Sequence, residues 1–269
     1  VHLPRGSRGS VVSTAIHIVG ILDDGWSGLS DAARDALLQA ALVIGAQRTL
    51  ALVRPHLPQA ELRAQDGALA EVPAWISAAR EAGRTVAVLA TGDPLCHGIA
   101  SFLLGKLGCD GIDILPAPST LQLAFARWEK SWQDVAITSC HSKDAGEWQV
   151  GATPAHGLYP LLRAVALNTR VFAFTGPEND PARIARALIT AGYADDTRLS
   201  VASRLCLSDE AIFNELAPTE AATMCFAEPS VLLVERQPEP PAPRFGLEDL
   251  GPPPRTPATA RPPRRDARP

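Results

Sequence analysis

Short, continuous runs of apolar and often β-branched residues recur along the first 236 residues, and helical patterns separate them. Runs of this length without polar alternation are typical of strands covered on both faces. Strands that alternate with helices indicate an α/β fold with a mainly parallel sheet, either one large sheet or two smaller ones. Eight runs predict strands, at 15–20, 42–44, 85–90, 112–115, 135–138, 170–175, 199–202 and 231–234.

The helical patterns between these runs carry recognisable start and stop signals. Polar N-cap residues, acids in the first turn, proline at the first helical position and glycine after the last turn mark helix ends. Four helices are predicted in this way: one after Ser30, one over 72–82 that stops at Gly83, one from Asp180 and Pro181 to Gly192, and one from Ser208 with Asp209 and Glu210 in its first turn.

Composition divides the chain into four parts. Pro116-Ala117-Pro118 predicts a hinge between an N-terminal α/β domain over 14–115 and a C-terminal α/β domain over 116–236. From Gln237 onward, eleven of 33 residues are proline, with six arginines and few large apolar side chains. Such a segment buries too little to offset its ordering entropy, so 237–269 is predicted to be a disordered Pro/Arg-rich tail or linker. Residues 1–13 are predicted to be a disordered start or an expression scar.

Charge and cysteine content exclude several classes of protein. The 269 residues are 46% hydrophobic and 20% charged, with a net charge of -4, so no basic surface for nucleic acid is expected. The apolar runs are too short to span a membrane. Neither a signal peptide nor paired cysteine spacing is visible, which predicts reduced thiols and a cytoplasmic location. The five cysteines are Cys96, Cys109, Cys140, Cys206 and Cys225.

Ligands of open α/β sheets bind beyond the carboxyl ends of the strands, so the loops there are the candidate site. The segment 20–25 places Asp23 and Asp24 between two glycines, which suits a cationic or neutral ligand better than a phosphate. It matches neither the dinucleotide fingerprint nor a P-loop. In 90–94, Gly92 permits a close backbone approach, and Asp93 could cap a helix or bind a ribose diol. Ser119 or Thr120 could cap the helix that follows the hinge and face a ligand there.

His141 follows the strand near 135 and is the remaining candidate for chemistry. It could act as acid or base, as a substrate ligand or as a metal ligand. No second His or Cys stands at ligand spacing, which argues against metal. Cys140 has no local feature that would activate it as a nucleophile, and no Gly-x-Ser-x-Gly elbow is present.

Several segments, in this order and spacing, resemble the tetrapyrrole methylase family. The resemblance is strongest to its precorrin-6Y C5,15-methyltransferase branch, the CbiE-type methylase half of cobalamin biosynthesis, and spans roughly 14–236. The matching segments are HIVGILDDG (17–25) with GLS (28–30), ALVIGA (41–46) with Arg48, VLATGDPL (88–95) with Gly98, PAPSTLQLAFA (116–126), WQD (132–134), SCHS (139–142), NDPARIA (179–185) and LSDE (207–210).

The resemblance implies two α/β domains with the active site in the cleft between them, as in class III methyltransferases, and a homodimer. It implies S-adenosylmethionine as methyl donor and a corrin precursor as acceptor, methylated at C5. The segment FGL (245–247) resembles the junction to a second domain in fused members, so a partner decarboxylating methyltransferase domain is a candidate as well. The donor-binding residues implied are Gly20, Leu22, Asp23, Ala90, Thr91, Gly92, Asp93, Ser119, Thr120, Ala173, Thr175 and Ala202.

Three positions depart from the family pattern. Leu22 replaces a glycine, His97 stands where an aromatic residue is frequent, and Arg204 stands where an acid is common. Because Leu22 has a side chain where the family has glycine, a ligand is expected to approach the backbone of the first loop less closely.

The implied chemistry agrees with the residues. A sulfonium donor suits a cleft edged by Asp23, Asp24 and Asp93. Methyl transfer to an electron-rich macrocycle needs mainly positioning. The acceptor carries carboxylates that need basic partners, for which the candidates are Arg48, Arg127, His141, Lys143 and Arg163. His141 is the predicted catalytic residue, orienting a propionate or a ring nitrogen.

Three other interpretations stay open. One is a family member that methylates a different ring position. Another is a nicotinamide oxidoreductase, which the missing Gly-x-Gly-x-x-Gly disfavours. The third is a non-catalytic half that docks a separate methyltransferase.

Overall fold

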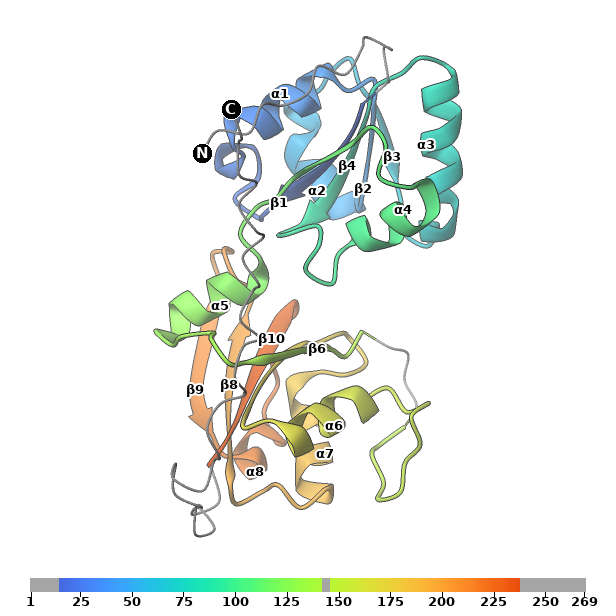
Figure 1. Ribbon diagram of the computed structural model, residues 1–269. Helices are drawn as coiled ribbons and strands as arrows, with labels where there is room; N and C mark the ends of the chain where they lie inside the picture. Colours follow the sequence, from blue (N-terminus) through green and yellow to red (C-terminus); the bar gives the residue numbers. More distant parts are fainter. Residues whose placement is uncertain (1–14, 142–145, 238–269) are drawn as a thin grey trace, which may run out of the picture. The chain divides into compact units, whose positions relative to one another are not determined.

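The computed structural model describes residues 15–141 and 146–237, which contain two five-stranded sheets (Figure 1). The first sheet has the order β3-β2-β4-β1-β5, and all its neighbouring strands are parallel. Its strands are β1 (Ile16–Ile21), β2 (Leu42–Gly45), β3 (Glu61–Ala64), β4 (Val86–Thr91) and β5 (Ile112–Leu115).

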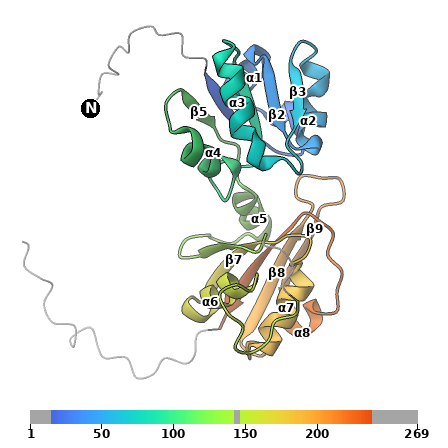
Figure 2. The same ribbon diagram turned by 90° about the vertical axis from the view of Figure 1, so that its right-hand side faces the viewer.

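Helices cover both faces of the first sheet (Figures 1 and 2). Along β1, Ile16 and Ile18 belong to one buried cluster, whereas Val19 and Ile21 belong to the other. The first cluster includes α3 (Val72–Glu81) and α4 (Ile99–Leu107), and the second includes α1 (Asp31–Gln39) and α2 (Gln47–Val53). The continuous apolar runs of β1, β2 and β4 therefore arise as predicted, because both faces of these strands are buried. Short 3₁₀ turns complete this half: η1 (Gly25–Gly28), η2 (Arg54–His56) and η3 (Leu69–Glu71).

The second sheet has the order β6-β7-β10-β8-β9 and is mixed. Only β6 and β7 are parallel, and the other neighbours are antiparallel. The prediction of a mainly parallel arrangement is therefore wrong for this sheet. Its strands are β6 (Ala136–Ser139), β7 (Arg170–Phe174), β8 (Thr197–Ser203), β9 (Ala211–Leu216) and β10 (Ser230–Arg236), with α5 (Thr120–Trp128), α6 (Tyr159–Leu167), α7 (Pro181–Thr190) and α8 (Pro218–Ala221).

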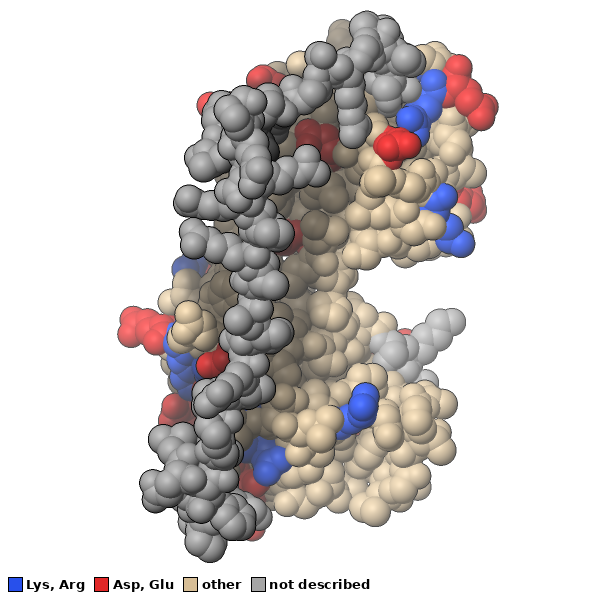
Figure 3. Space-filling view, viewed as in Figure 1, with Lys and Arg blue, Asp and Glu red and all other residues tan. Residues whose placement is uncertain are grey.

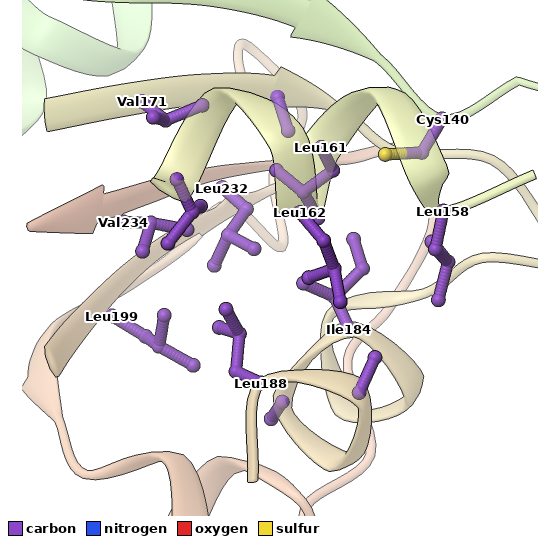
Figure 4. Close-up of a cluster of buried hydrophobic side chains, with 14 of the residues drawn as sticks. Cys140, Leu158, Leu161, Leu162, Val171, Ile184, Leu188, Leu199, Leu232 and Val234 are labelled. Carbon is purple, nitrogen blue, oxygen red and sulfur yellow. The ribbon is translucent and has the colours of Figure 1, made fainter. Parts of the chain in front are cut away.

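Two hydrophobic clusters stabilise the second sheet. In the larger one, Leu161 of α6 and Leu188 of α7 pack against Leu232 of β10 (Figure 4). In the other, Phe125 and Trp128 of α5 pack against Phe172 of β7. Helix α5 is thereby fixed to the second sheet, while its N-terminus continues from the hinge.

The predicted helix after Ser208 is wrong. Residues 207–209 form a turn, and β9 follows as an antiparallel partner of β8. The two acids that suggested a helix start are instead ion-paired, Asp209 with Arg204 and Glu210 with Arg127. The other strand that the sequence missed is β3, whose Glu61 and Arg63 are exposed at the edge of its sheet, so that no apolar run marks it.

The other helix signals are confirmed. The side chain of Ser30 accepts a hydrogen bond from the Ala33 N–H at 3.3 Å. The Asp180 carboxylate accepts one from the Arg183 N–H at 2.7 Å. Ser119 and Gln122 cap each other's backbone N–H groups at the start of α5. Within the described ranges, no helix is long and apolar enough to cross a membrane. The predicted N-terminal segment, Lys143 and the tail after Gln237 lie outside the described residues.

Three backbone segments meet at the carboxyl end of β1: Gly20 in the strand itself, the bend at Gly92 after β4, and the hinge at Ala117. A Cβ atom added to Gly20 would lie 2.2 Å from the carbonyl oxygen of Gly92 and 2.4 Å from the backbone nitrogen of Ala117. Both neighbours are backbone atoms, so neither can rotate away. The end of β1 and the segment after β4 therefore pack directly on the hinge with no room for a side chain.

Replacing Gly20 by alanine is expected to lower the free energy of unfolding by at least about 2–3 kcal/mol, because the new methyl group overlaps two backbone segments. The matched control is Gly105→Ala in α4, where an added Cβ meets nothing within 4 Å. That change is expected to raise stability by roughly 0.5–1 kcal/mol through helix propensity. Urea unfolding measures both, and equal stability of the two variants would contradict the close packing.

Candidate functional site

A pocket of about 350 Å³ lies where the ends of strands from both sheets meet. Its volume falls within the range of roughly 300–1,000 Å³ that is usual for small-molecule sites. Both sheets belong to one compact unit. On the face in Figure 3, the hollow at the right of the molecule is bordered mainly by uncharged residues. The pocket lining includes Leu22, Asp23, Arg48, Gln65, Ala90, Thr91, Cys96, His97, Thr120, His141, Phe174, Thr175, Ala202, Leu205 and Ser230.

Eight predicted site residues line this pocket. They come from loops that are far apart in the sequence, as expected for the carboxyl ends of strands. They are Leu22, Asp23, Ala90, Thr91, Thr120, Thr175, Ala202 and His141.

The other five predicted residues do not line it. Gly20 lies near the end of β1, and Gly92 forms the bend after β4, with φ +68° and close to the Pro118 carbonyl oxygen. Ser119 is buried and caps α5. Asp93 accepts a hydrogen bond from the Leu95 N–H at 2.8 Å within its own turn. Ala173 is fully buried in the core of the second sheet. The end of β1, the bend at Gly92 and the cap support the site from behind.

The acidic edge expected from the sequence is altered by a basic partner. The Asp23 carboxylate is ion-paired with Arg48, and its side chain is only 11% exposed. Arg48 also donates from Nη2 to Thr91 Oγ1 at 3.3 Å, and its side chain is 47% exposed. Asp24 is exposed and, like Asp93, does not line the pocket. The pocket wall at Asp23 thus carries a paired charge, with the guanidinium as its more accessible member.

His141 contributes an imidazole that is neutral at pH 7. Its Nδ1 lies 2.8 Å from Ser139 Oγ. Its pKa is lowered from the ordinary value, mainly because surrounding atoms displace water and secondly because the charge of His97 opposes protonation. The centroid of the His97 ring lies 5.3 Å from that of the Phe174 ring, and the His97 backbone has φ +54°. The position that departs from the family pattern therefore still places an aromatic ring against the pocket wall.

The thiols near the site are not activated. Cys140 is buried, and burial raises its pKa to about 12. The pKa of Cys96 is raised by burial and by the charge of Asp93, and a hydrogen bond with Ser119 opposes this rise. Both thiols are protonated at neutral pH, which argues against covalent catalysis through either one.

The remaining basic candidates lie elsewhere. Arg127 is ion-paired with Glu210 at 2.6 Å outside the pocket, and Arg163 is exposed on α6. Lys143 is outside the described residues. Among the residues that are described, no group of three or more His, Cys, Asp or Glu side chains could hold a metal ion.

Sequence reasoning missed several lining residues. Gln65 follows the overlooked strand β3, and its buried Oε1 has no hydrogen-bond partner within the described part of the chain. Ser230 precedes the apolar run of β10, and its hydroxyl lies 2.8 Å from Thr175 Oγ1. Leu205 lies between β8 and β9, just before the helix that the sequence predicts at Ser208. Each of these three residues lies at or next to the end of a strand, but the sequence does not show which strand ends lie together in space.

Because both causes disfavour the imidazolium form, we expect His141 to become half-protonated at a pH below the ordinary histidine value of 6.5. In His97→Gln the pKa should rise part of the way back, since the effect of lost water remains. His56→Gln is the control, because His56 stacks on Trp26 and does not line the pocket. NMR titration of the ring resonances measures all three. A pKa at or above 6.5 in the unmodified protein would show that the imidazole is freely hydrated.

Comparison with known proteins gives consistent matches. A relative from Sinorhizobium sp, named Precorrin-6Y C(5,15)-methyltransferase [decarboxylating], is 30% identical over 211 residues, which is 78% of this chain and 47% of that protein. A Cobalt-precorrin-7 C(5)-methyltransferase from Salmonella typhimurium is 29% identical, over 65% of this chain and 78% of its own length. The chain thus spans about half the length of the decarboxylating relatives that it matches.

Solved structures agree in fold. The precorrin-6Y methylase (cbiE) of Archaeoglobus fulgidus superposes with a TM-score of 0.56 at 22% identity, covering 83% of this chain and 99% of that one. A uroporphyrin-III C-methyl transferase from Thermus thermophilus, complexed with S-adenyl homocysteine, gives a TM-score of 0.56 at 18% identity, with 82% and 92% covered. The family model for Tetrapyrrole (Corrin/Porphyrin) Methylases matches residues 15–219. The chain therefore belongs to the tetrapyrrole methylase family, as the loops at its strand ends predict.

Proposed function

We propose that this chain is an S-adenosylmethionine-dependent methyltransferase that methylates C5 of a precorrin-6Y-type corrin precursor in cobalamin biosynthesis. One observation carries the proposal: the loops through which the sequence resembles the family converge on one pocket large enough for a nucleoside-sized ligand.

The pocket residues suit the donor. Ala90, Leu22 and Ala202 provide apolar walls for an adenine or a thioether, and Thr91 and Thr120 offer hydroxyl groups to a ribose or an amino acid end. The end of β1 at Gly20, the bend at Gly92 and the capped start of α5 hold these walls in place. When bound, the donor supplies an electrophilic methyl group on sulfur. The protein's contribution is to fix that group beside the acceptor and to exclude water.

The polar side of the pocket suits the acceptor. Arg48 is held by Asp23 and Thr91, and about half of its side chain is exposed. Its remaining N–H groups can therefore donate hydrogen bonds to a carboxylate at the edge of the macrocycle. His141 is neutral, and its Nδ1 is taken by Ser139, which leaves Nε2 to contact a propionate or ring nitrogen. The unpartnered Gln65 Oε1 marks a third polar contact at the same side. These groups position the acceptor carbon and do not need to remove a proton from it.

The extent of the similarity supports the C5 position within this proposal. Relatives named for two positions and a decarboxylation are about twice as long as the matched region. Relatives named for C5 alone are matched over most of their length. We therefore propose the C5 step for the matched region. A homodimer, a cytoplasmic location and a partner decarboxylating methyltransferase domain stay predictions.

Isothermal titration of the full chain with S-adenosylhomocysteine tests the donor pocket. We expect saturable one-site binding and none with NAD, which addresses the oxidoreductase alternative. Thr120→Trp fills the pocket and should abolish binding. The control Ala126→Trp, on the exposed face of the same helix α5, should leave the Kd within about twofold, since it lies outside the pocket. Equal binding by the two variants would place the donor elsewhere.

The acceptor is tested by incubating the chain with methyl-labelled donor and a precorrin-6Y-type ring, with and without its metal. We expect one added methyl group, assigned to C5 by NMR. His141→Ala should raise the KM for the acceptor by about tenfold and leave the donor Kd unchanged. A label at another carbon would favour another family reaction, and no turnover unless a separate methyltransferase is supplied would favour a docking role.

A further inference from the structure

The loop between β8 and β9 forms a wall of the pocket that the proposed function does not otherwise use. Residues 204–210 connect the two strands, and Leu205 lies in the pocket lining with only 8% of its surface exposed. Leu205 also packs in the cluster with Phe172 of β7. Its side chain therefore joins the core of the second sheet to the site.

The backbone on both sides of Leu205 is in a conformation that is unusual for these residues. Arg204 has φ +55° and Cys206 has φ +66°. Non-glycine residues adopt this left-handed region only at an energetic cost, and such residues persist where surrounding contacts hold them. The loop thus needs partners to keep Leu205 directed into the pocket.

Glu210 supplies two of those contacts with its two carboxylate oxygens. Arg127 donates from Nε to Oε1 at 2.6 Å, and the Cys206 N–H donates to Oε2 at 2.7 Å. The pKa of Glu210 is lowered, chiefly by the Arg127 hydrogen bond, so the pair is charged at neutral pH. Arg127 lies in the last turn of α5, whose first residue, Thr120, lines the same pocket.

A second set of contacts restrains the start of the loop. Arg204 is paired with Asp209 at 2.7 Å and donates to the Glu228 carbonyl oxygen at 2.9 Å. This interaction explains the arginine at a position where the family usually has an acid: here the arginine is a partner for an acid five residues later. The basic and acidic groups of this loop are thus used within the protein.

We propose that Arg127 and Glu210 are positioning residues that preform the donor pocket by holding Leu205 against it. This proposal rests on the donor occupying the pocket, as argued above. It assigns Arg127 to the construction of the donor site and not to recognition of an acceptor carboxylate. Neither side chain lines the pocket, so their effect on binding passes through the loop.

The test is titration of the full chain with S-adenosylhomocysteine, with thermal unfolding in parallel. If loss of the Arg127 contact leaves the loop correctly placed in about a tenth of the molecules, the Kd rises about tenfold. We expect this in Arg127→Gln and a smaller rise in Arg127→Lys, which keeps the charge. The control is Arg186→Gln in α7: the Arg186 side chain is about as exposed as that of Arg127, it is ion-paired with Glu147, and its loss should leave the Kd unchanged.

A double-mutant cycle separates positioning from a general loss of stability. Leu205→Ala should weaken binding by itself, and Arg127→Gln should then add less than about twofold, because its effect passes through Leu205. A Kd for Arg127→Gln within twofold of the unmodified chain, or a tenfold effect that persists beside Leu205→Ala, would overturn the proposal. If the unmodified chain binds no S-adenosylhomocysteine, both this proposal and the proposed function fail. If it binds and Thr120→Trp abolishes that binding while Arg127→Gln has no effect, only this proposal fails.

Discussion

The site depends on backbone packing at the end of β1. Gly20 touches the carbonyl of Gly92 and the nitrogen of Ala117 at distances that leave no room for a Cβ atom. Close packing of main chain on main chain fixes position more rigidly than side-chain contacts, because no rotamer can relieve it. The Ser119 and Gln122 capping pair continues this fixed point into α5. The first sheet, the hinge and α5 together hold the pocket walls from the two sheets in fixed positions relative to each other.

Several charged side chains in and around the pocket form ion pairs with other side chains of the protein. Asp23 faces Arg48, Arg127 faces Glu210 and Arg204 faces Asp209. The pKa of the His141 imidazole is lowered, which favours its neutral form at physiological pH. The proposed methyl transfer to an electron-rich carbon needs mainly the positioning of two ligands, and the thiols of Cys96 and Cys140 have raised pKa values. The acid-rich edge suggested by the sequence is therefore better described as a support for a guanidinium.

Much of the fold could be predicted from the sequence, because its core strands and helix caps have local physical signals. The core strands of the first sheet were visible because both faces are buried, and Ser30, Ser119 and Asp180 were visible as caps because their side chains satisfy N–H groups one turn later. The edge strand β3 was not visible, because its polar side chains face solvent. The helix expected at Ser208 does not form: Asp209 pairs with Arg204 at the end of β8, and Glu210 pairs with Arg127 of α5. Pairing across 83 residues, such as Arg127 with Glu210, leaves no local signal in the chain.

A crystal structure of the chain with S-adenosylhomocysteine is the most direct measurement of the central claim. The account predicts density for the ligand in the pocket, in contact with the segments that contain Thr91, Thr120 and Ala202, with the end of β1 at Gly20 unmoved. Density for the ligand on another surface, with this pocket filled only by solvent, would contradict it.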